Sequence, residues 1–234
     1  MQIAAVLFDL DGTILDNTLA FEKIYDTISE KVHYTLKVHN VHYNKESIRN
    51  DIVRFHQKMR RKAEYNRDLW WPSFISQYKS GINFPLASIK NLTTTYWQLF
   101  EEYSRPFLDT IPTIQYLLQK NYRLGLISDT DGLKGEKQRR ITMNKSITKF
   151  FDTIVIAGED TERTKIDPQP FLFAAEKIKI PPKNCLYVGD NPYTDIQGAI
   201  RAKMKSVLIY RGKWEDEIYP DYVISQLSDL KKIL

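Results

Sequence analysis

The sequence predicts an α/β fold, in which a doubly wound, mainly parallel sheet carries an inserted all-helical domain. Five short apolar runs, at 3–9, 122–128, 153–158, 185–190 and 205–210, alternate with segments whose apolar residues have helical spacing. The runs are mostly apolar rather than alternating, which is typical of strands buried on both faces of a parallel sheet. Between the first and second runs, residues 16–105 show only helical patterns, and this interruption predicts the insertion.

The elements follow in a simple order. After the first run, amphipathic patterns predict helices at 21–32, 45–65, 69–78 and 86–104, with no convincing strand among them. The chain is expected to return to the sheet at Arg105 and Pro106, because the residue before a proline resists helical geometry. Further helices are expected at 111–121, 170–180 and 195–204. This order indicates a Rossmann-like core of residues 1–15 and 106–234 and a helical domain of residues 16–105.

Composition excludes some classes of protein. The 234 residues are 42% hydrophobic, which suffices for a buried core. With Cys185 as its one cysteine, the chain has no internal disulfide and no multi-thiolate zinc site. The apolar N-terminal stretch lacks a basic flank and soon meets carboxylates, so we expect neither a signal peptide nor a membrane span. We therefore expect a cytoplasmic protein.

Acidic side chains follow three of the predicted strands. Asp9 ends the first run, Ser128 and Asp129 end the second, and Asp190 ends the fourth, while Lys165 lies in the loop after the third. Ligands of open α/β sheets bind beyond the carboxyl ends of the strands, so we expect these side chains to lie close together. Carboxylates gathered in one place repel unless a cation neutralises them, and oxygen ligands favour magnesium over zinc. The sequence therefore predicts a Mg²⁺ site.

These residue types suit phosphoester hydrolysis. A carboxylate beside a divalent cation, here Asp9, can attack phosphorus and divide the reaction into two covalent steps. Asp11, two positions on, can protonate the leaving oxygen and then deprotonate water, and Gly12 permits the tight backbone that this return needs. Ser128 can donate hydrogen bonds to phosphate oxygens, and Lys165 can offset developing negative charge. Read alone, Asp11 and Gly12 could instead form a hairpin turn, although a helical pattern follows them.

Four segments together resemble the motifs of the haloacid dehalogenase superfamily. They are DLDGT at 9–13, Ser128 within LISDT, Lys165 within TKIDPQPF, and GDNPYTD at 189–195, in the order and with the spacing of that superfamily. The likeness covers residues 1–15 and 106–234. The helical insertion after the first motif resembles the superfamily's helical cap.

The resemblance implies a role for each matched residue. Asp9 would be the nucleophile, and Asp11 the general acid/base and a magnesium ligand through its backbone carbonyl. Asp190 would be a magnesium ligand beside Asp9, Ser128 would bind phosphate, and Lys165 would stabilise the phosphoryl group and the nucleophile. The remaining expected site residues flank these positions; they are Asp129 at the phosphate, and Gly12, Thr13, Asn191 and Asp195 as supporting residues.

Two details bear on the chemistry. Dehalogenases of the superfamily lack a second carboxylate at the position of Asp11, because their leaving group needs no proton, so Asp11 favours phosphate-ester hydrolysis. Many relatives have Lys-Pro where this chain has Lys165 and Ile166, and Arg163 is a nearby cation. Whether Arg163 shares the role of Lys165 is left open, with Lys165 preferred.

The inserted helical domain carries most of the net charge. Residues 16–105 hold 14 lysines and arginines against 10 aspartates and glutamates, which gives +4 of the total +5. A basic lid attracts anionic substrates and excludes water on closing. We expect a magnesium-dependent phosphatase for a small phosphorylated metabolite of the sugar, triose or glycolate phosphate type. We expect no membrane association, and a monomer or a homodimer.

Two other functions are considered. A phosphomutase of the same superfamily would use the same residues and would need a phosphorylated sugar activator. A basic nucleic-acid-binding or regulatory protein with a vestigial core would bind nucleic acid in a salt-dependent way without phosphatase activity. The intact set of Asp9, Asp11, Lys165 and Asp190 favours an active enzyme.

Overall fold

The computed structural model describes residues 2–78, 85–211 and 218–234. The chain divides into two units, which are described separately. The core unit comprises Met1–Asp16 and Arg105–Leu234, and the helical unit comprises Asn17–Ser104. The core unit therefore extends one residue further at each junction than the predicted core of residues 1–15 and 106–234.

In the described part of the core unit, six parallel strands form the main sheet. Their order is β5 (Thr153–Ala157), β4 (Arg123–Asp129), β1 (Ala5–Phe8), β6 (Cys185–Gly189), β7 (Lys205–Ile209) and β8 (Tyr222–Ile224). Every pair of neighbours in this order is parallel. The predicted α/β fold is therefore confirmed, with β8 as a strand that the sequence analysis missed.

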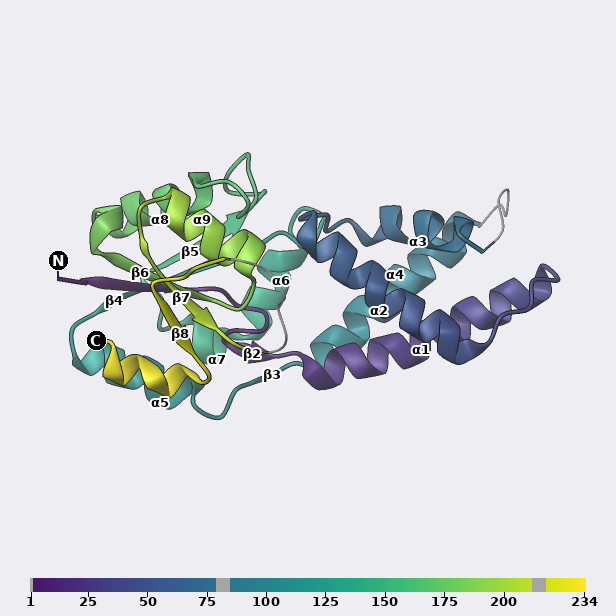
Figure 1. The fold of residues 1–234 in the computed structure, drawn as a ribbon, viewed down its shortest axis with the longest axis horizontal. Helices are drawn as coiled ribbons and strands as arrows, with labels where there is room; N and C mark the ends of the chain where they lie inside the picture. Colours follow the sequence, from purple (N-terminus) through teal and green to yellow (C-terminus); the bar gives the residue numbers. More distant parts are fainter. Residues whose placement is uncertain (1, 79–84, 212–217) are drawn as a thin grey trace. The chain divides into compact units, whose positions relative to one another are not determined.

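Alternation along the strands sends side chains to two apolar layers. Val6 and Phe8 of β1 belong to a core shared with α5 (Thr110–Gln119), α6 (Glu136–Met143), α7 (Lys145–Thr148) and the 3₁₀ helix η3 (Leu227–Lys232). Ala5 and Leu7 belong to the opposite core, with α8 (Gln169–Ile178) and α9 (Gln197–Arg201). Figure 1 shows α8 and α9 on one side of the sheet and α5 on the other. Burial on both faces explains why the strands read as continuous apolar runs.

A two-stranded ribbon forms where the chain leaves and re-enters the core unit. β2 (Leu15–Asp16) pairs antiparallel with β3 (Arg105–Pro106), with Leu15 opposite Pro106 and Asp16 opposite Arg105. The sequence analysis placed no strand within 16–105, and that was wrong at both ends of the segment. Two-residue strands carry too little pattern to be detected.

The described residues of the helical unit form four helices: α1 (Thr18–Val38), α2 (Lys45–Arg61), α3 (Arg67–Ser76) and α4 (Leu86–Tyr103). Their buried faces are rich in aromatic side chains, and Trp71, Phe74 and Tyr96 are almost completely inaccessible. Asn44 and Asn66 cap α2 and α3 by accepting hydrogen bonds from the backbone N–H groups two positions on. Among the described residues, no helix has both the length and the apolar character needed to cross a bilayer.

Candidate active site

The predicted strand-end residues meet at one edge of the sheet. β1 lies between β4 and β6, with Phe8 in register with Leu126 on one side and Val188 on the other. Asp9 directly follows β1, and its backbone N–H donates to the carbonyl of Val188 at 2.9 Å. Ser128 and Asp129 end β4, and Asp190 follows β6. Three adjacent strands therefore place their terminal polar residues side by side.

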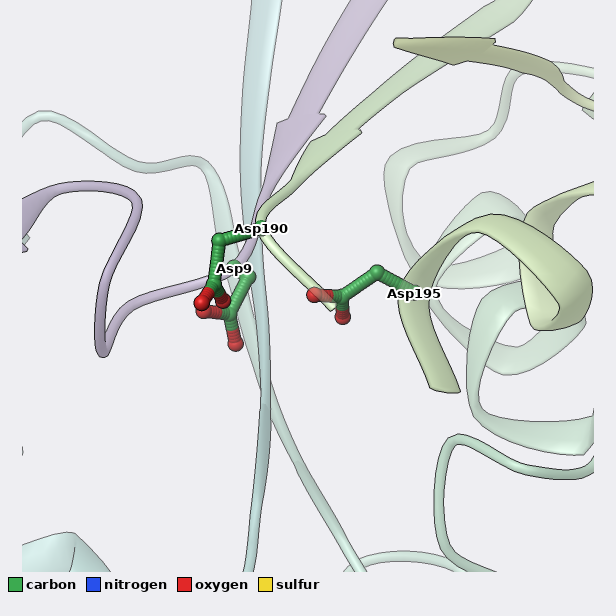
Figure 2. A group of neighbouring side chains, drawn as sticks. All are labelled: Asp9, Asp190 and Asp195. Atoms are coloured by element: carbon green, nitrogen blue, oxygen red, sulfur yellow. The ribbon is translucent and has the colours of Figure 1, made fainter. Parts of the chain in front are cut away.

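A group of three carboxylates, the carboxylate cluster, lies at this edge. It consists of Asp9, Asp190 and Asp195, each of which offers a carboxylate oxygen within 4.8 Å of the others. All three are buried, with exposed fractions of 4%, 6% and 1%. Figure 2 shows Asp9 and Asp190 next to each other and Asp195 directed toward them from the turn after β6. The sequence analysis gave Asp195 a supporting role; the structure adds it to the group that could hold a cation.

Lys165 connects two members of the cluster. Its Nζ lies 2.5 Å from Oδ1 of Asp9 and 2.6 Å from Oδ1 of Asp195. Burial alone would lower the pKa of Lys165, but the charges of Asp195 and Asp9 raise it well above its ordinary value, so the amine is charged. Its backbone N–H donates to Oδ1 of Asp129 at 2.8 Å, which fixes the loop against the end of β4. Arg163 is exposed, so it is Lys165 that contacts the cluster.

The charge of the cluster fits a divalent cation. Burial raises the pKa of Asp9 to about 7, an effect that Lys165 opposes and that Asp195 and Asp11 reinforce. Three carboxylates that are buried close together repel one another strongly in a low-dielectric interior, and a bound cation would reduce that repulsion. Oxygen donors alone are the ligands that Mg²⁺ takes in proteins. The residues present therefore suit Mg²⁺.

Asp195 is held in place by its own hydrogen bonds. The Tyr187 hydroxyl lies 3.0 Å from Oδ1 of Asp195, and the backbone N–H of Asn191 donates to Oδ2 at 3.0 Å. The side chain of Asn191 accepts from the N–H of Tyr193 and so caps the single π-helical turn η2 (Pro192–Ile196) that carries Asp195. Both oxygens of Asp195 are thus engaged, and its contact with Nζ of Lys165 suits it to orient that side chain. Sequence reasoning missed Tyr187, a hydroxyl within an otherwise apolar strand.

Gly12 is required by two features of its position. Its φ of +91° lies in the left-handed region, and a Cβ there would lie 2.7 Å from Oδ2 of Asp190. Only glycine permits both the conformation and the close approach to the carboxylate. The next residue, Thr13, is fully buried, and its Oγ1 has no hydrogen-bond partner within the part of the chain that the structure describes. A buried hydroxyl without a protein partner commonly forms its hydrogen bond with a ligand or a water molecule.

The carboxylate of Asp11 lies outside the cluster, in a network with α6 that we call the α6 ion-pair network. Oδ2 of Asp11 is 2.7 Å from Nζ of Lys137, and Oδ1 is 2.5 Å from a terminal nitrogen of Arg140. Arg140 also donates to both oxygens of Asp131 at 2.9 Å, and Lys137 lies 2.9 Å from Asp131. Burial would raise the pKa of Asp11, but Arg140 and Lys137 outweigh it and hold the pKa well below its usual range. In this arrangement Asp11 is a carboxylate anion.

The sequence analysis missed both cations of this network. α6 follows Gly135, whose φ of +89° ends the preceding loop, and Lys137 and Arg140 are three residues apart on one helical face. Both residues are only 3% exposed. In the sequence, GEKQRR looks like a solvated polar run. The one available signal was the pair of cations at helical spacing soon after Asp131.

Comparison with known proteins gives three informative matches. The family model described as "haloacid dehalogenase-like hydrolase" matches residues 3–203. A pyrophosphatase, PpaX, of Bacillus mycoides is 27% identical over 100% of this chain and 98% of its own. The crystal structure of a HAD phosphatase from Thermococcus onnurineus superimposes with a TM-score of 0.66 at 26% identity, covering 100% of this chain and 97% of that one.

A partial match is also informative. A glyceraldehyde 3-phosphate phosphatase of Methanopyrus kandleri is 34% identical over 138 residues, which are 56% of this chain and 58% of that protein. By their names, the Bacillus protein acts on pyrophosphate and the Methanopyrus protein on glyceraldehyde 3-phosphate.

Proposed function

Because the chain belongs to the haloacid dehalogenase-like hydrolases, and to their phosphatase type, we propose that it hydrolyses a small phosphomonoester of the sugar, triose or glycolate phosphate type through an aspartyl-phosphate on Asp9. The observation that carries the proposal is the position of Asp9. Its carboxylate is buried at the end of β1, 2.5 Å from a charged lysine and within 4.8 Å of a second strand-end carboxylate, Asp190.

The proposed reaction has two steps. In the first, an oxygen of Asp9 bonds to phosphorus as the bond from phosphorus to the ester oxygen breaks, and Asp11 gives that oxygen a proton. In the second, Asp11 takes a proton from a water molecule, whose oxygen attacks phosphorus and releases Asp9 and phosphate. The ionised Asp11 of the structure has the form that accepts a proton. To donate one, it must first take up a proton and loosen a contact to Lys137 or Arg140.

We assign the remaining site residues by the same reasoning. Ser128 and the orphaned hydroxyl of Thr13 suit contacts to phosphate oxygens, and Lys165 suits the neutralisation of developing charge. Asp129 is placed to fix the Lys165 loop, which supports phosphate binding indirectly.

Mg²⁺ is the cofactor that we propose. Asp9, Asp190 and the backbone carbonyl of Asp11 would hold it, with Asp195 behind Lys165. When bound, the ion supplies positive charge that attracts the phosphate oxygens and favours the ionised form of Asp9.

The substrate class follows from charge and from the relatives. The helical unit carries most of the net positive charge of the chain, which supports an anionic metabolite rather than a neutral one. We propose that residues 16–105 act as a cap that selects the substrate and residues 1–15 and 106–234 as the catalytic core. The single cysteine, Cys185, is buried and free, which supports a cytoplasmic location.

A substrate screen tests the proposal. Phosphate release would be measured with Mg²⁺ on a panel that includes pyrophosphate, glyceraldehyde 3-phosphate, 2-phosphoglycolate and sugar phosphates. We expect turnover of at least one member, and none by Asp9→Asn. Activity that needs a sugar bisphosphate activator would indicate a mutase instead, and inactivity of the wild type on every phosphate ester would contradict the proposal.

A further inference from the structure

A fully buried tyrosine hydroxyl contacts two charged groups of the candidate active site. Tyr187 is the middle residue of β6, and its ring lies in the apolar layer that β6 shares with α8 and α9. Phenylalanine would fill nearly the same space without a polar group, and burial of a hydroxyl is costly unless it is hydrogen-bonded. Packing alone therefore does not explain a tyrosine at this position.

The hydroxyl has partners both as a donor and as an acceptor. It lies 3.0 Å from Oδ1 of Asp195, and Nζ of Lys165 donates to it at 3.4 Å. The backbone carbonyl of Ile127 is a second acceptor, at 3.3 Å. A tyrosine keeps its single proton at neutral pH, and a hydrogen bond to a carboxylate is stronger than one to a carbonyl. We therefore expect the hydroxyl to donate to Asp195 and to accept from Lys165.

Tyr187, Asp195 and Lys165 form a closed triangle of contacts. The same oxygen of Asp195, Oδ1, lies 2.6 Å from Nζ of Lys165 and 3.0 Å from the hydroxyl. The third side, from Nζ to the hydroxyl, is 3.4 Å. Because each group contacts the other two, loss of any one of them loosens the remaining pair.

The ammonium group of Lys165 has three N–H donors and three acceptors in the protein. The acceptors are Oδ1 of Asp9 at 2.5 Å, Oδ1 of Asp195 and the Tyr187 hydroxyl. A lysine side chain is flexible, so its direction depends on such contacts. Two of the three acceptors belong to the triangle, and the third is the carboxylate of Asp9. The triangle therefore directs the ammonium group at Asp9.

Close packing fixes the ring that carries the hydroxyl. Phe171 of α8 meets the Tyr187 ring edge to face, with centroids 4.8 Å apart. Gly198 of α9 makes room for this arrangement, since a Cβ there would lie 2.2 Å from Cε2 of Phe171 and 2.4 Å from the carbonyl oxygen of Lys165. The same contacts thus locate the tyrosine ring and the backbone of Lys165.

We propose that Tyr187 is a positioning residue, whose hydroxyl holds Asp195 and Lys165 so that the ammonium group stays on Asp9. The hydroxyl acts through these two side chains and not on the substrate. The inference rests on the proposed function, because the step that it assists is the attack of Asp9 on phosphorus. Without the hydroxyl, Lys165 is held less firmly and neutralises less of the negative charge that develops in that step.

A matched pair of tyrosine variants tests the proposal. Tyr187→Phe keeps the ring and removes only the hydroxyl. The control, Tyr122→Phe, removes a hydroxyl that lies 3.3 Å from the carbonyl of Leu234. Tyr122 directly precedes β4, so it lies at the opposite end of that strand from Ser128. Both variants would be assayed with Mg²⁺ on a phosphate ester identified in the screen.

The two variants should differ in kcat. We expect Tyr187→Phe to lower kcat about tenfold, which is the scale of one hydrogen bond to a charged group. Tyr122→Phe should have the kcat of the wild type. KM should stay the same in both variants, because neither hydroxyl contacts the substrate. A wild-type kcat in Tyr187→Phe would overturn the proposal.

A double-mutant cycle with Asp195→Asn distinguishes positioning from a merely structural role. If the hydroxyl acts through Asp195, Tyr187→Phe should lower kcat much less in the Asp195→Asn background than in the wild type. A hydroxyl that only supports the fold would lower kcat by the same factor in both backgrounds. Equal factors would therefore overturn the proposal.

The same four proteins test the contact without any turnover. In urea unfolding, the effects of Tyr187→Phe and Asp195→Asn on the free energy of unfolding should be non-additive, because residues in contact are coupled. Additive effects would show that the hydroxyl does not engage Asp195 and would overturn the proposal. Absence of turnover in the wild type would instead refute the proposed function, a result distinct from equal kcat values in an active enzyme.

Discussion

Replacing Arg140 with methionine should destabilise the core unit severely. The α6 ion-pair network holds two cations and two carboxylates, and the side chains of Lys137, Arg140 and Asp131 are each 4% exposed. Without Arg140, Asp11 and Asp131 lose the guanidinium that they share, and two buried carboxylates keep less positive charge beside them. Breaking a buried pair in this way costs about 3–5 kcal/mol. For a chain of this length, 1 kcal/mol shifts Tm by roughly 2–4 °C, so we expect a fall of roughly 6–20 °C.

The neighbouring arginine is the control for this experiment. Arg139 is half exposed and pairs with Glu136 at 3.0 Å, so Arg139→Met should change the free energy of unfolding by no more than about 0.5 kcal/mol. The double variant Arg140→Met, Asp131→Asn removes one buried carboxylate together with the guanidinium and should recover part of the loss. Calorimetric unfolding of the variants measures these effects. Equal Tm values for Arg140→Met and Arg139→Met would refute the reasoning.

Three further predictions concern proton transfer, the metal and pH. Asp11→Asn should slow turnover of an alkyl phosphate about 10²–10⁴-fold. An aryl phosphate with a good leaving group should lose much less, because only the alkoxide leaving group needs a proton. Equal losses for the two substrates would count against Asp11 as the acid. EDTA should abolish phosphate release and Mg²⁺ restore it, with Asp190→Asn requiring more Mg²⁺; rescue by Zn²⁺ alone would contradict an oxygen-only magnesium site. Because burial, Arg67 and Arg60 lower the pKa of His56, the unfolded chain takes up a proton near pH 6.5 that the folded chain resists. The free energy of unfolding should therefore be highest above pH 6.5 and fall below it, by up to about 1.4 kcal/mol per pH unit. Urea titrations should show that this fall is shallower in His56→Gln than in the wild type. The same pH dependence in both proteins would show that His56 is not the cause.

The fold was predictable from the sequence wherever a buried element is long enough to give a clear run of apolar residues. The strands that flank β1 are apolar on both faces, so their runs stand out in the sequence. β8 has three residues, of which only Ile224 is buried, and β2 and β3 have two residues each. Strands this short show too little alternation of apolar and polar residues to be recognised in the sequence. α6 contains a polar run whose two buried members are charged, which reverses the usual relation between charge and exposure.

The strand-end residues of the site were predictable for a related reason. Asp9, Ser128 and Asp190 are tied to strands, and the topology of an open sheet brings strand ends together. Lys137 and Arg140 are not at a strand end, and only the folded position of Asp11 identifies them as its partners.

The phosphoenzyme is the most direct test of the central claim, that Asp9 attacks phosphorus. The enzyme would be mixed with a phosphate ester identified in the screen and Mg²⁺, quenched in acid during turnover, digested and examined by mass spectrometry. We predict a peptide that contains Asp9 and is heavier by one phosphoryl group, and its absence from Asp9→Asn. Turnover without such a peptide, or a phosphoryl group mapped to another residue, would contradict the account.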